Sequence, residues 1–68
     1  MKKKAIEIFL EHFDGNQSAA GRALGKKQQH VWYWLNTEEA DMPTDLIPKA
    51  AELIGKTPHD LKPEVFRQ

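Results

Sequence analysis

The side chains best suited to chemistry in this 68-residue chain lie in one short stretch near its middle. Two glutamines, Gln28 and Gln29, follow two lysines. A glutamine amide can bridge the N6 and N7 atoms of adenine in a DNA major groove, and a lysine ammonium can neutralise a phosphate. Two aromatic residues, Trp32 and Tyr33, come slightly later and offer surface for thymine methyl groups, unpaired bases or a protein partner. The stretch indicates binding chemistry.

Residues typical of catalytic and metal centres are few and scattered. Cysteine is absent, which excludes disulfides and thiolate metal sites and is compatible with a reducing compartment. The three histidines are too far apart in the sequence for a recognisable metal-ligand spacing. The single serine, Ser18, falls in the first turn of an expected helix, where capping is its ordinary role. We therefore expect no enzyme, no metal and no cofactor.

Size and charge limit the function further. A chain of 68 residues and 7.8 kDa forms one domain, too small for a deep catalytic cleft. The formal net charge is zero, but residues 1–35 carry six basic against three acidic side chains, a net +3. Residues 36–68 carry four basic against seven acidic side chains, a net −3. This asymmetry predicts an anionic partner for the first half.

The start of the chain imitates a secretion signal without completing it. Three lysines, Lys2 to Lys4, precede an apolar stretch, but Glu7 and Glu11 interrupt it and no small-residue cleavage site follows. No apolar run reaches the roughly 20 residues that cross a bilayer. We expect a cytoplasmic protein with no membrane partner. The lysines are expected to be a solvated chain end, with a basic arm over phosphates as the alternative.

Apolar periodicity predicts an all-α chain with five helices. The expected helices span about residues 3–13, 17–24, 28–35, 46–54 and 58–62. Thr44 is a possible cap of the fourth helix, whose apolar face includes Leu53, and Pro48 fits only in its first turn. Thr57 is expected to cap the fifth helix.

The C-terminal half is where an alternative fold is open. Residues 36–43 are predicted to be an acidic loop, and the apolar side chains of Val65 and Phe66 are expected to fold back onto the fourth helix. A C-terminal β-hairpin would instead make the chain α+β. Pro58, Pro63 and the helical spacing favour helices.

The second and third expected helices have the requirements of a helix–turn–helix. Gly21 supplies a small residue where two helices touch, and Gly25 can adopt the positive φ that the turn needs. Leu24, Val31 and Trp34 supply the apolar packing. Gln28 and Gln29 would then face outward from the start of the third helix.

The stretch from Gln17 to Asn36 has a Gln-Ser start, an Ala-Leu-Gly turn, a Gln-Gln pair and a Trp-Leu-Asn end. These features resemble the Cro-type repressors of phages and their Cro-like antitoxin relatives. The closing stretch from Leu61 to Phe66 is similar to the Leu-Arg-Pro-Asp-apolar-aromatic tail common in that group. The resemblance implies a transcriptional repressor whose helix–turn–helix spans about residues 17–35 and whose recognition helix, residues 28–35, enters the major groove.

The resemblance also implies partners and residue roles. The partners are a pseudo-palindromic double-stranded DNA operator and a second copy of the chain, in a weak dimer on DNA, with no small-molecule substrate. Positions that match the family's base readers are Gln28, Gln29, Trp32 and Tyr33. Positions that match the family's phosphate contacts are Gln17 and Lys27. Beyond the resemblance, we expect Arg22 and Lys26 to contact the DNA backbone as well.

A rival function in another class rests on the aromatic pair and the acidic loop. Trp32 and Tyr33 could bind a protein partner, while Glu38, Glu39 and Asp41 repel DNA. The chain would then be an interaction module, or an antitoxin-like protein that binds DNA weakly. Partial burial of the aromatic pair against the fourth helix or a partner subunit is the remaining alternative.

Overall fold

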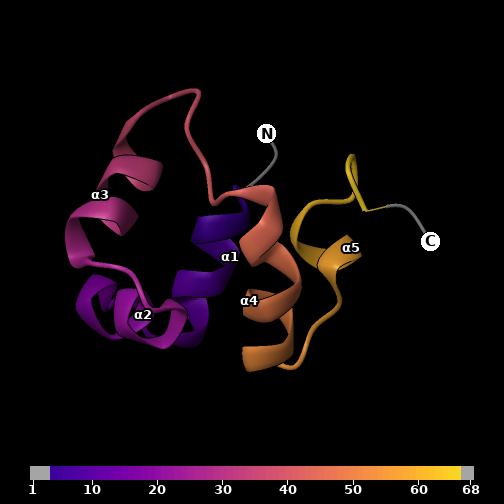
Figure 1. Ribbon diagram of the computed structural model, residues 1–68, viewed down its shortest axis with the longest axis horizontal. Coiled ribbons are helices and arrows are strands. Elements are labelled where there is room, and N and C mark those ends of the chain that lie inside the picture. Colours follow the sequence, from indigo (N-terminus) through magenta and orange to yellow (C-terminus); the bar gives the residue numbers. More distant parts are fainter. Residues whose placement is uncertain (1–3, 67–68) are drawn as a thin grey trace.

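The computed structural model describes residues 4–66, which form an all-α fold without a strand (Figure 1). The elements are α1 (Ala5–His12), α2 (Gln17–Leu24), α3 (Gln28–Asn36), the 3-10 turn η1 (Thr44–Leu46), α4 (Ile47–Leu53) and α5 (Pro58–Leu61). The predicted five-helix, all-α fold is confirmed, and the α+β alternative with a C-terminal hairpin is wrong for this part of the chain. The expected start of the first helix at residue 3, and the roles considered for Lys2 and Lys3, fall outside the described residues.

Helix α1 lies at the centre and packs against all four other helices. Figure 1 shows α2 and α3 on one side of it and α4 and α5 on the other. Its buried residues, Ala5, Ile6, Phe9 and Leu10, form one apolar stripe because they recur at helical spacing. The α2–α3 pair packs against α1 through this stripe.

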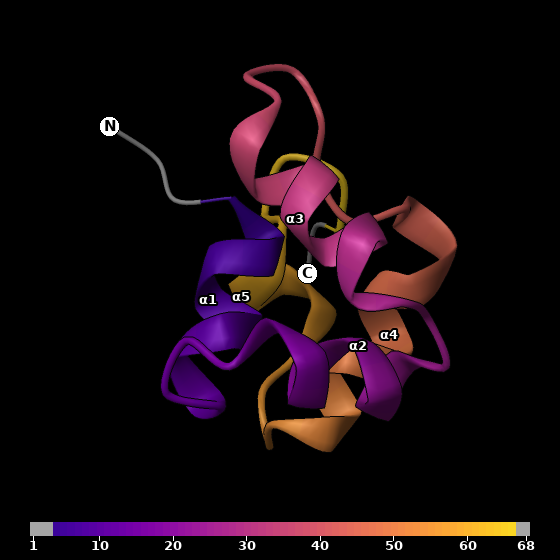
Figure 2. The same ribbon diagram turned by 90° about the vertical axis from the view of Figure 1, so that its left-hand side faces the viewer.

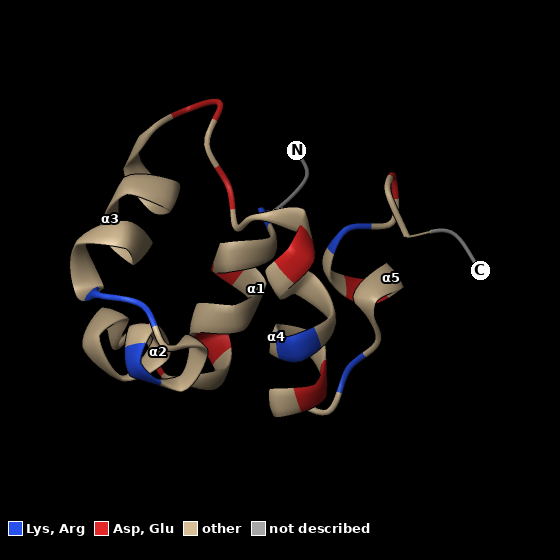
Figure 3. Cartoon of the chain, viewed as in Figure 1, with Lys and Arg blue, Asp and Glu red and all other residues tan. Residues whose placement is uncertain are grey.

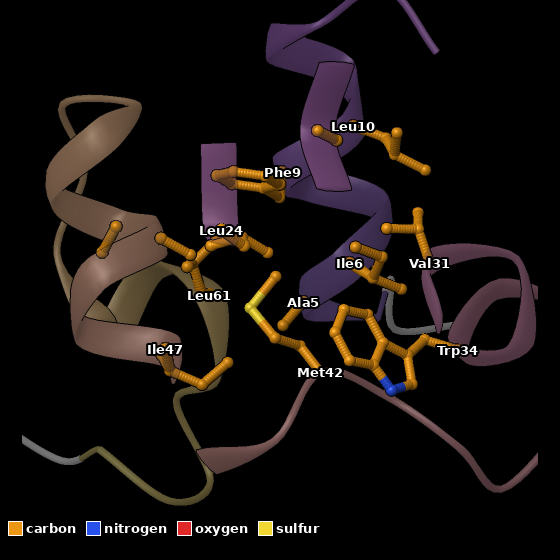
Figure 4. Packing of buried hydrophobic residues seen from close by; sticks show 13 residues of the cluster. Ala5, Ile6, Phe9, Leu10, Leu24, Val31, Trp34, Met42, Ile47 and Leu61 are labelled. Carbon is orange, nitrogen blue, oxygen red and sulfur yellow. The ribbon is translucent and has the colours of Figure 1, made fainter. Parts of the chain in front are cut away.

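The loop between α3 and α4 contributes a core residue that periodicity does not reveal. Met42 is 1% exposed and lies in the same cluster as Ile6, Trp34 and Ile47 (Figure 4). An unbranched thioether side chain fills irregular gaps between helices. The buried side chain thus anchors the end of an otherwise polar loop.

The helix ends confirm some capping predictions and correct others. Asn16, and not Ser18, caps α2: its Oδ1 accepts a hydrogen bond from the Ala19 N–H at 3.0 Å, and Ser18 is exposed inside the helix. Thr44 caps nothing, because the chain enters α4 through η1 and no side chain accepts a hydrogen bond there. Thr57 does cap α5, and Pro48 does lie in the first turn of α4.

Two apolar residues of the C-terminal half are more exposed than expected. The buried stripe of α4 follows positions 47, 50 and 51 and continues to the half-buried Ile54, which turns Leu53 outward to 45% exposure. Phe66 packs against the core, and its carbonyl oxygen lies 2.7 Å from His59 Nδ1. Val65 does not fold back and is 49% exposed.

No helix in residues 4–66 has both the length and the apolar character needed to cross a membrane.

Candidate nucleic-acid interface

A tight turn joins α2 to α3, and glycine makes it possible at two points. Gly25 has a φ of 72° and ends α2 in a left-handed conformation. The Lys26 N–H donates to the Gly21 carbonyl at 2.8 Å, and the Gly25 N–H donates to the Arg22 carbonyl at 3.1 Å. These two bonds form a Schellman motif, which satisfies the last carbonyls of α2 and reverses the chain toward α3.

Gly21 is the point of closest approach between α2 and the turn. A Cβ atom at this position would lie 2.9 Å from the Lys26 carbonyl oxygen, 3.3 Å from the Lys27 carbonyl carbon and 3.4 Å from the Gln28 nitrogen. Only a residue without a side chain fits there. The predicted roles of Gly21 and Gly25 are both confirmed, and Leu24, Val31 and Trp34 are buried as expected.

The exposed face of α3 presents all four predicted base readers. Gln28, Gln29, Trp32 and Tyr33 are exposed, with Trp32 at 56% and Tyr33 at 54%. At about 100° per residue these positions fall within an arc of about 140°, opposite Val31 and Trp34. Figure 2 shows this helix lying across the front of the molecule, beside α2. Neither aromatic residue is among the buried or half-buried side chains that pack against the core, so the expected partial burial against α4 is wrong.

The same face includes a residue to which the sequence assigned no role. Asn36, the last residue of α3, is exposed, and its Nδ2 donates to the Trp32 carbonyl at 2.9 Å. A helical wheel places it between Trp32 and Gln29, so the periodicity could have added it to the face.

The basic residues expected at phosphates collect at the start of α3, apart from one polar residue. Lys26 and Lys27 are exposed in the turn, and Arg22 is exposed on the last turn of α2 (Figure 3). Gln17 is half-buried at the opposite end of α2, about 7.5 Å from Arg22 along the helix axis. The structure thus groups three of the four predicted phosphate contacts and separates Gln17 from them.

His30 is a second residue to which the sequence assigned no role. Its Nδ1 accepts a hydrogen bond from the Lys27 N–H at 3.3 Å, and its ring stacks over Trp34 with centroids 6.4 Å apart. His30 stands three residues after the N-cap Lys27, so its ring nitrogen satisfies the free N–H of the N-cap residue, although the ammonium of Lys27 cannot accept a bond in return. It helps to hold the first turn of α3, which carries Gln28 and Gln29.

The acidic loop after α3 divides into two parts with different surroundings. Glu38 and Glu39 are exposed at its tip (Figure 3). Asp41 turns inward instead: its oxygens accept hydrogen bonds from the Ala5 N–H at 3.0 Å and the Ile6 N–H at 3.1 Å. Of the three carboxylates expected to repel DNA, Asp41 is therefore the one that is bound to the start of α1 and is not exposed.

A shallow groove of about 440 Å³ lies beside α1 and has the wrong charge for a phosphate backbone. Its lining residues are Glu7, Leu10, Glu11, Asp14, Gly15 and Leu35. Three of the six are carboxylates. A phosphate backbone would be repelled there, so the arrangement favours the α2–α3 turn as the surface for an anionic polymer.

Comparisons with protein-family models, with curated proteins and with solved structures find no match to this chain.

Proposed function

We propose that this chain is a sequence-specific DNA-binding protein of the repressor type, with α3 as the helix that enters the major groove. The observation that carries the proposal is the exposed face of α3, where two glutamines and two aromatic residues project from a helix that begins at two exposed lysines. A B-DNA major groove is about 12 Å wide and admits one α-helix. Nine residues make α3 about 13.5 Å long, which spans about four base pairs.

The dimensions of the molecule support a weak dimer on DNA. Two recognition helices that read successive major grooves on one face of DNA lie about 34 Å apart. The longest extent of the Cα trace is 31 Å, and α3 lies near one end of it (Figure 1). Two copies of a molecule that measures 31 × 25 × 20 Å can therefore occupy neighbouring half-sites. Such a pair occludes a promoter when both half-sites are present, and a small interface lets it separate in free solution.

The proposal assigns roles by position. Gln28 and Gln29, in the first turn of α3, read base edges, and Trp32 and Tyr33 contact thymine methyl groups. Lys26 and Lys27 hold phosphates, and the neighbouring Arg22 reaches the same strand. The free N–H groups at the start of α2, where Gln17 is the first residue, bind another phosphate.

A first experiment locates the surface. Amide chemical shifts are followed by NMR while a generic duplex is added at low salt. Changes clustered at residue 17 and residues 26–33 support the proposal. No change on α3 contradicts it and favours the rival function, a protein-interaction module built on Trp32 and Tyr33, which are both more than half exposed.

A second experiment separates base reading from phosphate binding on a duplex selected from a randomised pool. Gln28→Ala should cost about 1–3 kcal/mol on the selected duplex and almost nothing on an unrelated one. Lys27→Ala should weaken both duplexes and lower the salt slope by about one unit. Lys49→Ala removes the same charge from an exposed site on α4 and should change neither value. Equal loss on both duplexes for Gln28→Ala would contradict base reading.

A further inference from the structure

The C-terminal end of α3 is held by a lysine from the start of the chain. Lys4 Nζ donates hydrogen bonds to the carbonyl oxygens of Trp34, at 2.8 Å, and Thr37, at 2.6 Å. The last carbonyls of a helix have no partner within the helix and form the negative end of its dipole. The half-buried ammonium of Lys4 therefore acts as a C-terminal cap for α3. This finding corrects the expectation that Lys4 is a solvated chain end.

The loop after α3 in turn supplies a side chain that caps the start of α1. Asp41 accepts the N–H groups of Ala5 and Ile6, the first two residues of α1, and also its own neighbour's N–H, that of Met42, at 2.7 Å. Lys62 Nζ lies 3.8 Å from Asp41 Oδ2, so the carboxylate also connects to the end of α5. A carboxylate at a helix N-terminus is stabilised by the free N–H groups and the dipole.

These contacts fasten a short loop at both ends to three consecutive residues. Thr37 is bound to the side chain of Lys4, and Asp41 is bound to the backbone of Ala5 and Ile6. The next residue, Met42, is in the core. The orientation of α3 is consequently set at two points, at its start by the Gly21 contact and at its end by Lys4.

Contacts between α3 and bases depend on the fixed position of the C-terminal end of this helix. A tilt of about 5° around the start of α3 moves its last turn by about 1 Å over the helix length. Trp32 and Tyr33, in the second turn, would shift by about 0.5–0.7 Å, and a gap of this size removes much of a van der Waals contact with a thymine methyl group. Lys26 and Lys27 lie at the pivot, and their flexible side chains can follow a phosphate through such a tilt.

From this geometry we infer that Lys4 and Asp41 are positioning residues, which orient α3 for base reading without contacting DNA. The inference rests on the proposed function. Loss of Lys4 should lower affinity for the selected duplex and spare affinity for unrelated DNA. It should also loosen the end of α3 in the free protein.

The test compares Lys4→Met, which keeps the apolar stem and removes the donors, with Lys4→Arg, which keeps donors and charge. Lys49→Met is the matched control, because it makes the same exchange at an exposed position on α4. Two quantities are measured at a temperature where circular dichroism shows each variant folded. They are affinity for the selected and unrelated duplexes over a range of salt, and amide hydrogen exchange at residues 33–37 without DNA.

For Lys4→Met we expect about a tenfold loss of affinity on the selected duplex, less than about a twofold change on the unrelated one, and an unchanged salt slope. Exchange at residues 33–37 should quicken by about tenfold. Lys4→Arg should recover most of both effects, and Lys49→Met should show neither. Asp41→Asn, a milder change that keeps one acceptor oxygen, should show the same pattern to a smaller extent and serves if Lys4→Met fails to fold.

Three results would overturn the inference. Unchanged exchange at residues 33–37 would show that Lys4 does not hold α3. Equal loss on both duplexes with a lower salt slope would make Lys4 a phosphate contact. A loss that Lys4→Arg does not recover would mean that the stem, and not the cap, matters. A wild-type chain that binds no duplex at low salt would instead overturn the proposed function, and the positioning role with it.

Discussion

Replacement of Gly21 by alanine tests the contact that sets the angle between α2 and α3. The added Cβ would lie 2.9 Å from the Lys26 carbonyl oxygen, whereas ordinary contact begins at 3.4 Å, so the turn must move by about 0.5 Å. Forced repacking of this kind costs about 1–3 kcal/mol, and the better helix propensity of alanine offsets up to about 1 kcal/mol. We expect a net loss of about 1–2 kcal/mol in the free energy of unfolding, or a fall of about 4–16 °C in Tm.

The displaced atoms belong to Lys26, Lys27 and Gln28, so Gly21→Ala should also weaken binding to the selected duplex below its Tm. Gly25→Ala is the matched control: it adds the same atom at a φ of 72° with no neighbouring atom within 4 Å. Its backbone strain should cost about 1–2 kcal/mol, and Gly25→Asn should recover part of that. Urea unfolding and binding titrations at low temperature measure both effects. Wild-type stability in Gly21→Ala, or wild-type affinity, would refute the reasoning.

Three further predictions concern stability. Phe9→Ala empties the centre of the core, where Phe9 is fully buried, and should cost about 3–5 kcal/mol in urea unfolding, enough to leave the chain largely unfolded at 37 °C. Asp14 has a φ of 54° at the end of α1, where α2 and α4 have glycine, so Asp14→Gly should raise Tm by a few degrees, and a lower Tm would contradict this. The Thr57 N–H, bonded to Asp60 Oδ2 at 3.0 Å, and the Thr57 hydroxyl hold the pKa of Asp60 below its ordinary value. The stabilisation from this lowered folded-state pKa is therefore present above about pH 4 and is lost as the pH falls through the folded value. The wild type should unfold at higher urea than Asp60→Asn at pH 7, and the difference should shrink at pH 3.

Local signals in the sequence were sufficient to predict the helices and the α2–α3 turn. Periodic apolar residues mark each buried face, and Gly21 and Gly25 satisfy requirements that act within a few residues. The capping of α2 was assigned to the wrong neighbour because Asn16 and Ser18 are both good N-cap residues and lie two positions apart. In α4, the buried stripe includes Ala51 and not Leu53, a choice between two apolar residues that the spacing alone did not decide.

The contacts that tie α3 to α1 could not be predicted, because they join residues 30 or more positions apart. Neither Lys4 nor Asp41 belongs to a periodic pattern, and each stands within a run of like-charged residues that is ordinarily solvated. Met42 likewise is a single apolar residue in a polar loop. Their roles depend on where the folded chain brings the end of α3, which is a property of tertiary packing. The exposed face of α3 was therefore predictable from the sequence, but the contacts that hold α3 in place were not.

Under the proposed function, the contacts that hold α3 matter more in this chain, whose net charge is zero, than they would in a strongly basic DNA-binding protein. Arg22, Lys26 and Lys27 are exposed near the start of α3, and Glu38 and Glu39 are exposed after its end, so the two carboxylates offset most of the basic charge beside the helix. Attraction to phosphates is independent of sequence and supplies much of the affinity of basic proteins. In a chain of zero net charge this attraction is small, so under the proposed function base contacts must supply a larger share of the binding free energy. Base contacts depend on helix orientation, which is the property that Lys4 and Asp41 are proposed to fix. A shallow salt dependence together with a strong sequence preference is the combination that this architecture should produce.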